Sequence, residues 1–285
     1  MATKKAKATV KKTTVKKPQV AKSKKVTKEV KASLLVKIQK SIACKCSVAK
    51  GMPSIGALVA EFIGTFMLIA AIFAVQGQPL FVAFAVIGIV LIIAGASKAH
   101  INPAVTVGAW VTRKICSSCA IGYIAAQALG ASAGFLVINA FLENAKSAAT
   151  DIYSAAPTMF HAATFAPGKE WFVLFAELLG SFIVALGVSK AMKSAKAIYA
   201  ITYGFAVLIA LIIAGSVTSM LLTESNTALT FLNPATAIAA NAVSWNVWPI
   251  VIFIVTPVIG AIAGFALNDL LNNNSCDCED GKCNC

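Results

Sequence analysis

Ile101-Asn102-Pro103-Ala104 and Leu232-Asn233-Pro234-Ala235 are near copies of one tetrapeptide, and each opens a short apolar stretch. The two stretches cover residues 102–111 and 233–243. A helix rises ~1.5 Å per residue, so about ten residues span ~15 Å, half of the ~30 Å hydrocarbon core of a bilayer. Asn is a strong N-cap and Pro suits the first helical turn. Each Asn-Pro-Ala box therefore predicts the start of a half-length helix.

Six longer apolar segments surround the two boxes, at residues 55–75, 80–97, 120–142, 171–189, 197–217 and 247–267. Each has roughly the 17 to 25 residues that a membrane-spanning helix needs. Apolar residues make up 58% of the chain and charged residues only 13%, with a mean hydropathy of +0.80. This composition argues against an ordinary soluble domain. The sequence predicts an all-α membrane protein with six transmembrane helices.

The membrane segments form a duplication. AEFIGTF at residues 60–66 returns as AELLGSF at 176–182. Further matches follow in the same order: LIIAG at 91–95 and 211–215, and GASAGF at 130–135 with GAIAGF at 260–265. Each half has three spans, so the second half enters the membrane from the opposite side, and repeats 55–142 and 171–267 are inverted. Irregular backbone at membrane depth must be buried or line a wet cavity. Two half-helices meeting by their N-termini at the midplane therefore predict a pore.

The positive charge of the chain belongs to its N-terminal tail. Residues 1–54 hold 16 Lys and one Glu and carry +15, whereas residues 55–285 hold 9 Lys or Arg against 10 Asp or Glu and carry −1. Basic segments stay on the cytoplasmic side of a membrane, and an even number of spans returns the chain to that side. We therefore expect a multi-pass membrane protein with both termini in the cytoplasm.

With these features the sequence resembles the aquaporin, or major intrinsic protein, family over about residues 55–268. The resemblance rests on the two Asn-Pro-Ala boxes in duplicated positions, on Ala99-His100-Ile101 before the first box, and on Tyr123-Ile124-Ala125-Ala126-Gln127 in the third span. It implies an aquaporin-like inverted repeat of six transmembrane helices plus two half-helices. It also implies a homotetramer, with one pore per subunit, that passes water or small uncharged solutes.

The boxes themselves suggest how such a pore excludes ions. Asn102 and Asn233 would point carboxamide N–H groups into the pore, where the positive ends of both half-helix dipoles also converge. A water molecule there turns its oxygen toward both amides and cannot accept a proton from a neighbour, and a cation meets a repulsive potential. The alternative is that both Asn side chains only cap helices, which does not explain why the boxes recur in register.

Four polar residues are candidates for supporting the loops of the pore: Glu61, Glu177, His100 and Gln127. A charge inside a membrane suggests a proton relay, but a buried carboxylate that accepts hydrogen bonds from loop backbone would hold a half-helix in place. The resemblance assigns the two glutamates this second role. His100 is also a candidate donor in the pore wall near the cytoplasmic half, with a pH gate as the alternative, and Gln127 is a candidate loop support.

The expected selectivity constriction departs from the pattern of the family. Most aquaporins have Arg three residues after the Asn of the second box, where this chain has Thr236. The other three constriction positions map to Val82, Thr230 and, through the LIIAG match, Ile212, although an insertion before the second box disturbs that last register. Without a guanidinium the ring loses a fixed charge and a forked donor. We expect passage of water plus small neutral solutes such as urea or glycerol.

The tails carry separate expectations. Residues 1–28 lack the apolar side chains of a core and are expected to be disordered. Residues 30–42 have the spacing of a basic amphipathic helix that would lie on anionic lipid, with a solvated tail as the alternative and nucleic-acid binding disfavoured. Residues 269–285 form a Cys-rich tail, whose weak candidates for a soft-metal site are Cys276, Cys278, Cys283 and Cys285. The cytoplasmic cysteines Cys44, Cys46, Cys116 and Cys119 are expected to be reduced.

Three other functional classes compete with a passive channel. A secondary transporter needs a coupling residue at the midplane, and the sequence has no acidic residue near the boxes. An enzyme needs a nucleophile, base or metal constellation, and none appears inside the spans, so neither catalysis nor a cofactor is expected. A non-conducting junction protein of the same fold stays open as the main alternative.

Overall fold

The computed structural model describes residues 52–148, 159–164, 167–222 and 227–272, together with strand residues 277–279 and 282–284. The chain divides into two units, of which Ser47–Asn274 forms the membrane domain. The other unit contains two short antiparallel strands, β3 (Asp277–Glu279) and β4 (Lys282–Asn284). The tail predictions for residues 1–28 and 30–42, and those for Cys44, Cys46, Cys276 and Cys285, lie outside the described residues.

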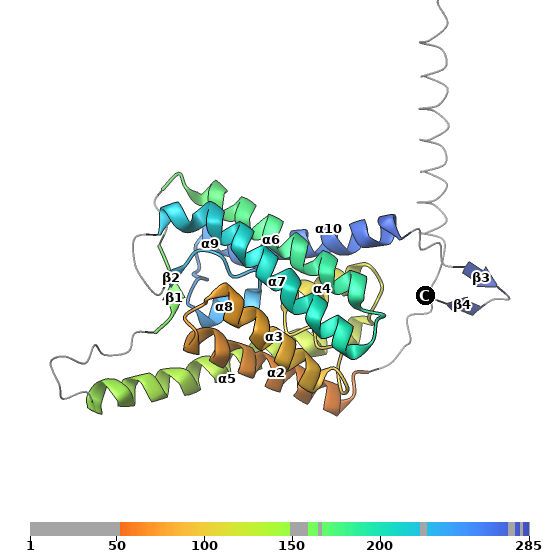
Figure 1. Cartoon of the computed structure of the whole chain (residues 1–285), viewed down its shortest axis with the longest axis horizontal. Coiled ribbons are helices and arrows are strands. Elements are labelled where there is room, and N and C mark those ends of the chain that lie inside the picture. The colour runs from red at the N-terminus through yellow and green to blue at the C-terminus, as the bar shows by residue number, and fades with distance from the viewer. Residues whose placement is uncertain are drawn as a thin grey trace, which may run out of the picture. The chain divides into compact units, whose positions relative to one another are not determined.

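The membrane domain is helical (Figure 1). Its elements in chain order are α2 (Ile55–Ala74), α3 (Pro79–Ile93), α4 (Pro103–Val111), α5 (Ser117–Ala148), β1 (His161–Ala162), α6 (Glu170–Ala191), α7 (Lys196–Thr218), η1 (Ser219–Leu221), β2 (Thr227–Ala228), α8 (Pro234–Ala239), α9 (Val247–Ile250), η2 (Val251–Val255) and α10 (Thr256–Leu271). Strands β1 and β2 pair in parallel. Between α9 and α10 the chain stays helical, with one π-helical turn at η2.

Among the residues that the structure describes, five helical runs are long and apolar enough to cross a membrane: α2, α5, α6, α7 with η1, and the run from α9 through α10. The sixth, α3, has 15 residues and is shorter than the predicted span at 80–97. It ends at Ile93 because the next residues turn into the loop that leads to α4. At ~1.5 Å per residue, α3 covers most of the hydrocarbon core but not all of it. With that change of boundary, the predicted fold of six helices and two half-helices is confirmed.

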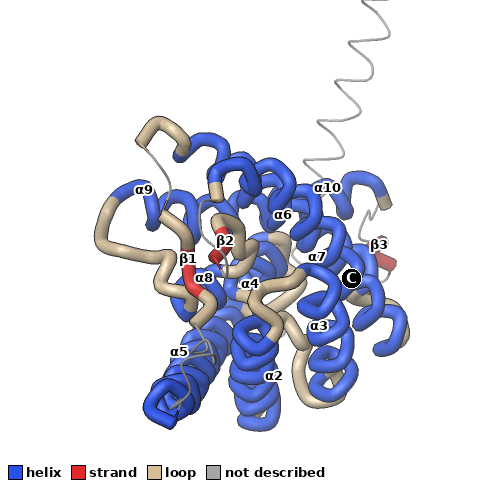
Figure 2. The backbone as a smooth tube through the Cα atoms, turned by 60° about the vertical axis from the view of Figure 1, so that its left-hand side comes forward, coloured by secondary structure: helices blue, strands red, loops and turns tan. Residues whose placement is uncertain are grey.

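The duplicated glycines explain how the two halves pack alike. Helix α2 packs against α5, and α6 packs against α10 (Figure 2). A Cβ at Gly130 of α5 would meet the carbonyl oxygen of Phe62 on α2, and a Cβ at Gly260 of α10 would lie 2.5 Å from the carbonyl oxygen of Leu178 on α6. Backbones approach this closely only where small residues leave room, as is common between membrane helices. Each half therefore closes around the same glycine contact.

The half-helices begin as the boxes predict. Asn102 is the N-cap of α4, and its Oδ1 accepts from the N–H of Ala104 at 2.8 Å. Asn233 is the N-cap of α8, and its Oδ1 accepts from the N–H of Ala235 at 3.0 Å. Helix α8 has only six residues and ends before the predicted limit at residue 243, because Asn241 turns the chain with a φ of +57°.

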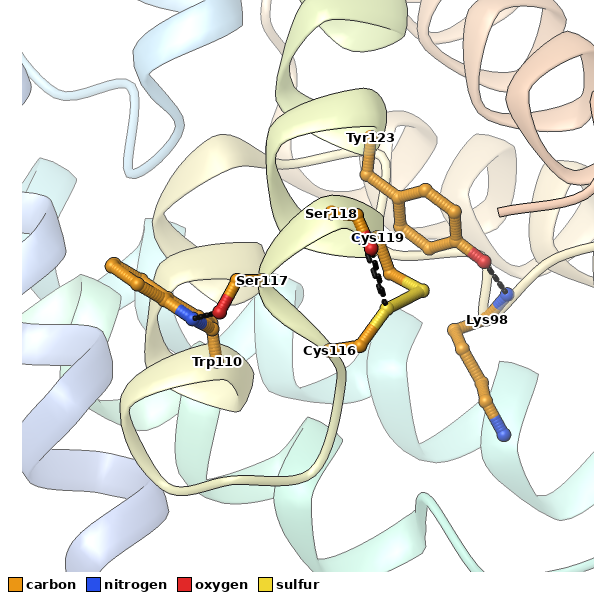
Figure 3. Close-up of a disulfide and its surroundings, with 7 residues drawn as sticks. All are labelled: Lys98, Trp110, Cys116, Ser117, Ser118, Cys119 and Tyr123. Atoms are coloured by element: carbon orange, nitrogen blue, oxygen red, sulfur yellow. Dashed lines mark hydrogen bonds between the residues drawn. A yellow bond between two sulfur atoms is a disulfide. The ribbon is translucent and has the colours of Figure 1, made fainter. Parts of the chain in front are cut away.

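A disulfide joins Cys116 and Cys119 at the start of α5 (Figure 3). The sequence analysis expects both cysteines to be reduced, and the structure corrects that expectation for this pair. Their Cα atoms are 5.0 Å apart, which is within the range that a disulfide can bridge. Beside this turn, the indole N–H of Trp110 on α4 donates to Ser117 Oγ at 3.0 Å. These contacts link the end of α4 to the first turn of α5.

Candidate functional site

The N-termini of the two half-helices are joined by a reciprocal pair of hydrogen bonds. Asn102 Nδ2 donates to the carbonyl oxygen of Leu232 at 3.0 Å. Asn233 Nδ2 donates to the carbonyl oxygen of Ile101, also at 3.0 Å. Each Asn therefore caps its own helix through Oδ1 and reaches the opposite loop through Nδ2. The two boxes, far apart in sequence, form one site.

A cavity borders this site. Both box asparagines line it, together with aliphatic side chains of α3 and α7 and residues of the loop before α8. Its wall is mostly apolar with a few polar groups, which is the usual character of a pathway or site for a small molecule. The cavity places the amides of Asn102 and Asn233 within reach of a solute.

Three of the four residues predicted for the constriction lie in the wall of this cavity: Val82, Thr230 and Thr236. The assignment of Ile212 is wrong. Ile212 is 51% exposed on the outer face of α7, and the neighbouring residue Leu211 lines the cavity. One residue along a helix turns a side chain by about 100°, so a register error of a single position moves it to another face. The insertion before the second box causes that error.

Glu61 holds the loop before α4 from the side of α2. Its Oε1 accepts from Ser97 Oγ at 2.8 Å and from the N–H of His100 at 3.0 Å. Its Oε2 accepts from the N–H of Ile101 at 2.8 Å and from Gln127 Nε2 at 2.8 Å. The carboxylate is fully buried. Four donors compensate its burial, because a buried charge is tolerated where hydrogen bonds replace water.

Glu177 has the equivalent position in the second half. It lies on α6, is fully buried and accepts hydrogen bonds from the backbone N–H groups of Phe231 and Leu232. The bond from Leu232 to Oε2 is 3.0 Å long. Both glutamates therefore face the loop residues that immediately precede a box, and neither lines the cavity. These contacts are those of a loop support.

The residue before each box is held in an unusual backbone conformation. Ile101 has a φ of +43° and Leu232 a φ of +56°, a region that side chains other than glycine rarely occupy. Such residues cost of order 1–3 kcal/mol each and persist only where their surroundings fix them. Here the N–H of each residue binds a buried glutamate and its carbonyl binds the opposite Asn. The strained turn directs the carbonyl toward the other half of the molecule.

His100 is fully buried beside the loop, and it is not among the residues that line the cavity. Its Nδ1 lies 3.1 Å from Thr106 Oγ1, and its ring packs edge-on against Tyr123 with centroids 5.6 Å apart. Burial lowers the pKa of His100 to about 4, although Glu61 opposes the shift and Lys98 adds to it. The imidazole is therefore neutral at physiological pH, which disfavours the idea of a pH gate.

Sequence reasoning missed two tyrosines of α7. Tyr203 lines the cavity, and its hydroxyl donates to the carbonyl oxygen of His100 at 2.6 Å. The hydroxyl of Tyr199 donates to the carbonyl oxygen of Lys98 at 3.1 Å. A signal existed, since Tyr199, Tyr203, Val207 and Leu211 recur every four residues and so share one helix face.

The cysteine prediction is only partly covered by the structure. Cys278 and Cys283 are direct partners in the register of β3 and β4. Within the part of the chain that the structure describes, no group of three or more His, Cys, Asp or Glu side chains could hold a metal ion. A soft-metal site that includes Cys276 and Cys285 stays a prediction from the sequence.

Comparison with known proteins identifies the family of this site. The profile of the family described as Major intrinsic protein matches residues 76–267. An aquaporin, AqpM, of Methanothermobacter marburgensis is 30% identical over 191 residues, which cover 63% of this chain and 70% of the relative. The aquaporin PIP2-7 of Arabidopsis thaliana is 30% identical over 245 residues, or 75% of this chain and 80% of the relative.

A solved structure has the same fold. The X-ray structure of the aquaglyceroporin from Plasmodium falciparum aligns with a TM-score of 0.58 at 20% identity, covering 75% of this chain and 95% of its own. The matched residues include both Asn-Pro-Ala boxes and the loops that the buried glutamates hold. The chain belongs to the major intrinsic protein family.

Proposed function

We propose that this protein is a passive membrane channel for water that also admits small uncharged solutes such as urea and glycerol. One observation carries the proposal: Asn102 and Asn233 line a single cavity while each caps a half-helix and binds the opposite loop. A channel that excludes ions needs fixed donors at a narrow point. The reciprocal hydrogen bonds hold both asparagine amides in place and leave one N–H of each amide available.

The asparagine amides have one N–H left for a passing molecule. A carboxamide nitrogen carries two hydrogens. Of these, one is used by the carbonyl of Leu232 at Asn102 and by that of Ile101 at Asn233. The second can donate to the oxygen of a water molecule in the cavity. Because the N-termini of α4 and α8 add partial positive charge at the same place, this water cannot relay a proton and a cation is repelled.

The wall of the cavity supports neutral solutes in addition to water. Val82, Leu211, Thr230 and Thr236 carry no charge. Thr236 is 3% exposed, and its Oγ1 is a buried oxygen without a hydrogen-bond partner in the described part of the chain. A buried hydroxyl without a partner costs free energy that a hydroxyl or amide of a solute can recover. The part of the wall that Thr230 and Thr236 form therefore favours polar, uncharged molecules.

The assembly and topology proposed here follow the family and the charges. Homotetramers are typical of the family, and many large apolar side chains are exposed on the outer helix faces, where lipid or neighbouring subunits would cover them. Both termini would be cytoplasmic, which places the +15 tail at residues 1–54 against anionic lipid. Nucleic acid is not a proposed partner, and no enzymatic activity is proposed.

The test is osmotic shrinkage of proteoliposomes followed by stopped-flow light scattering. Purified protein should raise water permeability above that of empty vesicles, linearly with the amount reconstituted, and should not raise proton permeability. Asn102→Ala should abolish most of the increase, whereas Asn246→Ala, at an exposed N-cap, should not. A solute flux that saturates as the solute concentration rises would favour a transporter. Folded protein that leaves water permeability at the level of empty vesicles would favour the junction protein and reject the channel.

A further inference from the structure

The cavity does not continue along the whole length of α7. Its lining residues on this helix are Leu211, Val207 and Tyr203, which lie four residues apart on one face. The next residue on the same face, toward Lys196, is Tyr199. Both tyrosines are buried, and their ring centroids are 6.1 Å apart. Two aromatic rings thus occupy the continuation of the cavity wall.

The hydroxyls of these rings bind the loop that faces α7. Tyr203 Oη donates to the carbonyl oxygen of His100 at 2.6 Å, and Tyr199 Oη donates to that of Lys98 at 3.1 Å. The N–H of His100 points the other way and binds Glu61 on α2. The loop is therefore held by α2 through its N–H groups and by α7 through its carbonyl groups. The tyrosines bridge the interval between α7 and the loop.

The other half of the molecule shows what the same architecture looks like without such a bridge. There Val82 and Val86 of α3 line the cavity, as do loop residues such as Thr230 and Leu232. Valine is shorter than tyrosine and has no hydrogen-bonding group. The loop before α8 therefore receives no hydrogen bond from a side chain of α3, whereas the loop before α4 is joined to tyrosine hydroxyls of α7. The two halves of the inverted repeat therefore differ at this face, with valines on α3 and tyrosines on α7.

We infer that Tyr203 is a specificity-determining residue, which forms the inner constriction of the pathway and sets the size of the solute that crosses. The inference rests on the proposed function. A molecule that leaves the cavity past Tyr203 must displace the hydroxyl from the carbonyl of His100 and turn the ring aside. Water can replace that hydroxyl as the donor to the carbonyl. Glycerol requires a larger displacement of the ring, so the constriction slows it more.

The test compares two variants at Tyr203 with a matched control in reconstituted full-length protein. Tyr203→Phe keeps the ring and removes the hydroxyl, whereas Tyr203→Val gives this half the side chain that α3 presents. The control is Tyr123→Phe. The hydroxyl of Tyr123, on α5, accepts from the N–H of Lys98 at 3.4 Å in the same loop (Figure 3). Tyr123 is not among the residues that line the cavity.

Water and glycerol permeabilities are measured by stopped-flow light scattering and normalised to protein content. Tyr203→Phe should raise water permeability about threefold to tenfold, the effect of one hydrogen bond on a barrier. Tyr203→Val should raise glycerol permeability by a larger factor than water permeability, so that the glycerol-to-water ratio increases. Tyr123→Phe should match the wild type in both quantities.

The outcomes separate this inference from the proposed function. If the wild type conducts water and both Tyr203 variants keep its water and glycerol permeabilities, the constriction is elsewhere and the inference is overturned, while the channel stands. If the wild type and all variants are folded and none conducts, the channel itself is rejected, and the inference with it. If Tyr203→Val does not fold, the response of the nearly isosteric Tyr203→Phe decides.

Discussion

The backbone N–H of Ile101 donates to Oε2 of Glu61 at 2.8 Å, although the two residues are 40 positions apart in the chain. The same carboxylate also binds Ser97, His100 and Gln127. Nearly every polar contact between α2 and the loop before α4 is therefore made by the Glu61 side chain. The position of the first Asn-Pro-Ala box depends on that side chain as much as on its own sequence.

Replacement of Glu61 tests this dependence. In Glu61→Gln, one oxygen becomes an NH2 group and faces two N–H or O–H donors, so two hydrogen bonds are lost and donors oppose each other. An unsatisfied buried donor costs about 1–3 kcal/mol. We expect a lower thermal unfolding temperature in detergent and a severalfold loss of water permeability. Lys193→Gln, at an exposed position after α6, is the control and should change neither. Wild-type permeability in Glu61→Gln would show that the loop does not need the carboxylate.

The glycine contacts between helices predict opposite effects for two Gly-to-Ala substitutions. A Cβ at Gly264 would lie 2.5 Å from the carbonyl oxygen of Phe182, a backbone atom that cannot move aside alone. Gly264→Ala should destabilise the protein by about 1–3 kcal/mol, as overpacking does. Gly88 in α3 has no atom within 4 Å of its Cβ position, so Gly88→Ala should stabilise by about 0.5–1 kcal/mol through helix propensity. Thermal unfolding that ranks the two variants the other way would contradict the packing.

Two substitutions at Thr236 test the role of the predicted selectivity constriction. Thr236→Val keeps the volume and removes the hydroxyl, and it should lower urea permeability about threefold to tenfold while water permeability changes less. Thr236→Arg adds bulk and a fixed charge, and it should lower urea permeability further. Urea flux into proteoliposomes measures both. The interpretation of the ring fails if Thr236→Arg, folded and still conducting water, admits urea as fast as the wild type.

The environment of His100 predicts how permeability responds to pH. Burial lowers the pKa of this residue from 6.5 to about 4, so the neutral imidazole persists across the physiological range. Protonation begins only as the pH falls toward the lowered pKa. Water permeability should therefore be constant between about pH 6 and pH 8, the window in which an ordinary histidine titrates. A step with a midpoint near the ordinary histidine pKa would show that His100 is accessible and charged in the open channel.

Much of the fold could be predicted because its signals are physically strong. Membrane-length apolar segments, two helix-start tripeptides and an odd number of spans per half allow one inverted arrangement. Boundaries were less predictable. Helix α3 ends at Ile93 because the following residues are pulled into a loop bound by Glu61, a contact that hydropathy does not report.

The cavity-lining residues were predicted correctly where their positions can be counted from the Asn-Pro-Ala boxes. They were missed where the prediction depends on which face of a helix points toward the cavity. Val82, Thr230 and Thr236 were placed by counting from Asn102 or Asn233, and all three line the cavity. Leu211 was missed in favour of Ile212, because an insertion breaks that count and one residue changes the helix face. Tyr203 was missed because an uncharged aromatic residue in a membrane helix resembles ordinary packing until its hydrogen bond is visible.

The reciprocal hydrogen bonds of Asn102 and Asn233 have a consequence for how the pore assembles. While the chain is being synthesised, the amide of Asn102 cannot find its final acceptor until Leu232 has emerged from the ribosome. A chain with only the first repeat would leave that amide without a hydrogen-bond partner in the hydrocarbon core, at a cost of several kcal/mol. It could escape this cost by joining a second copy inserted upside down.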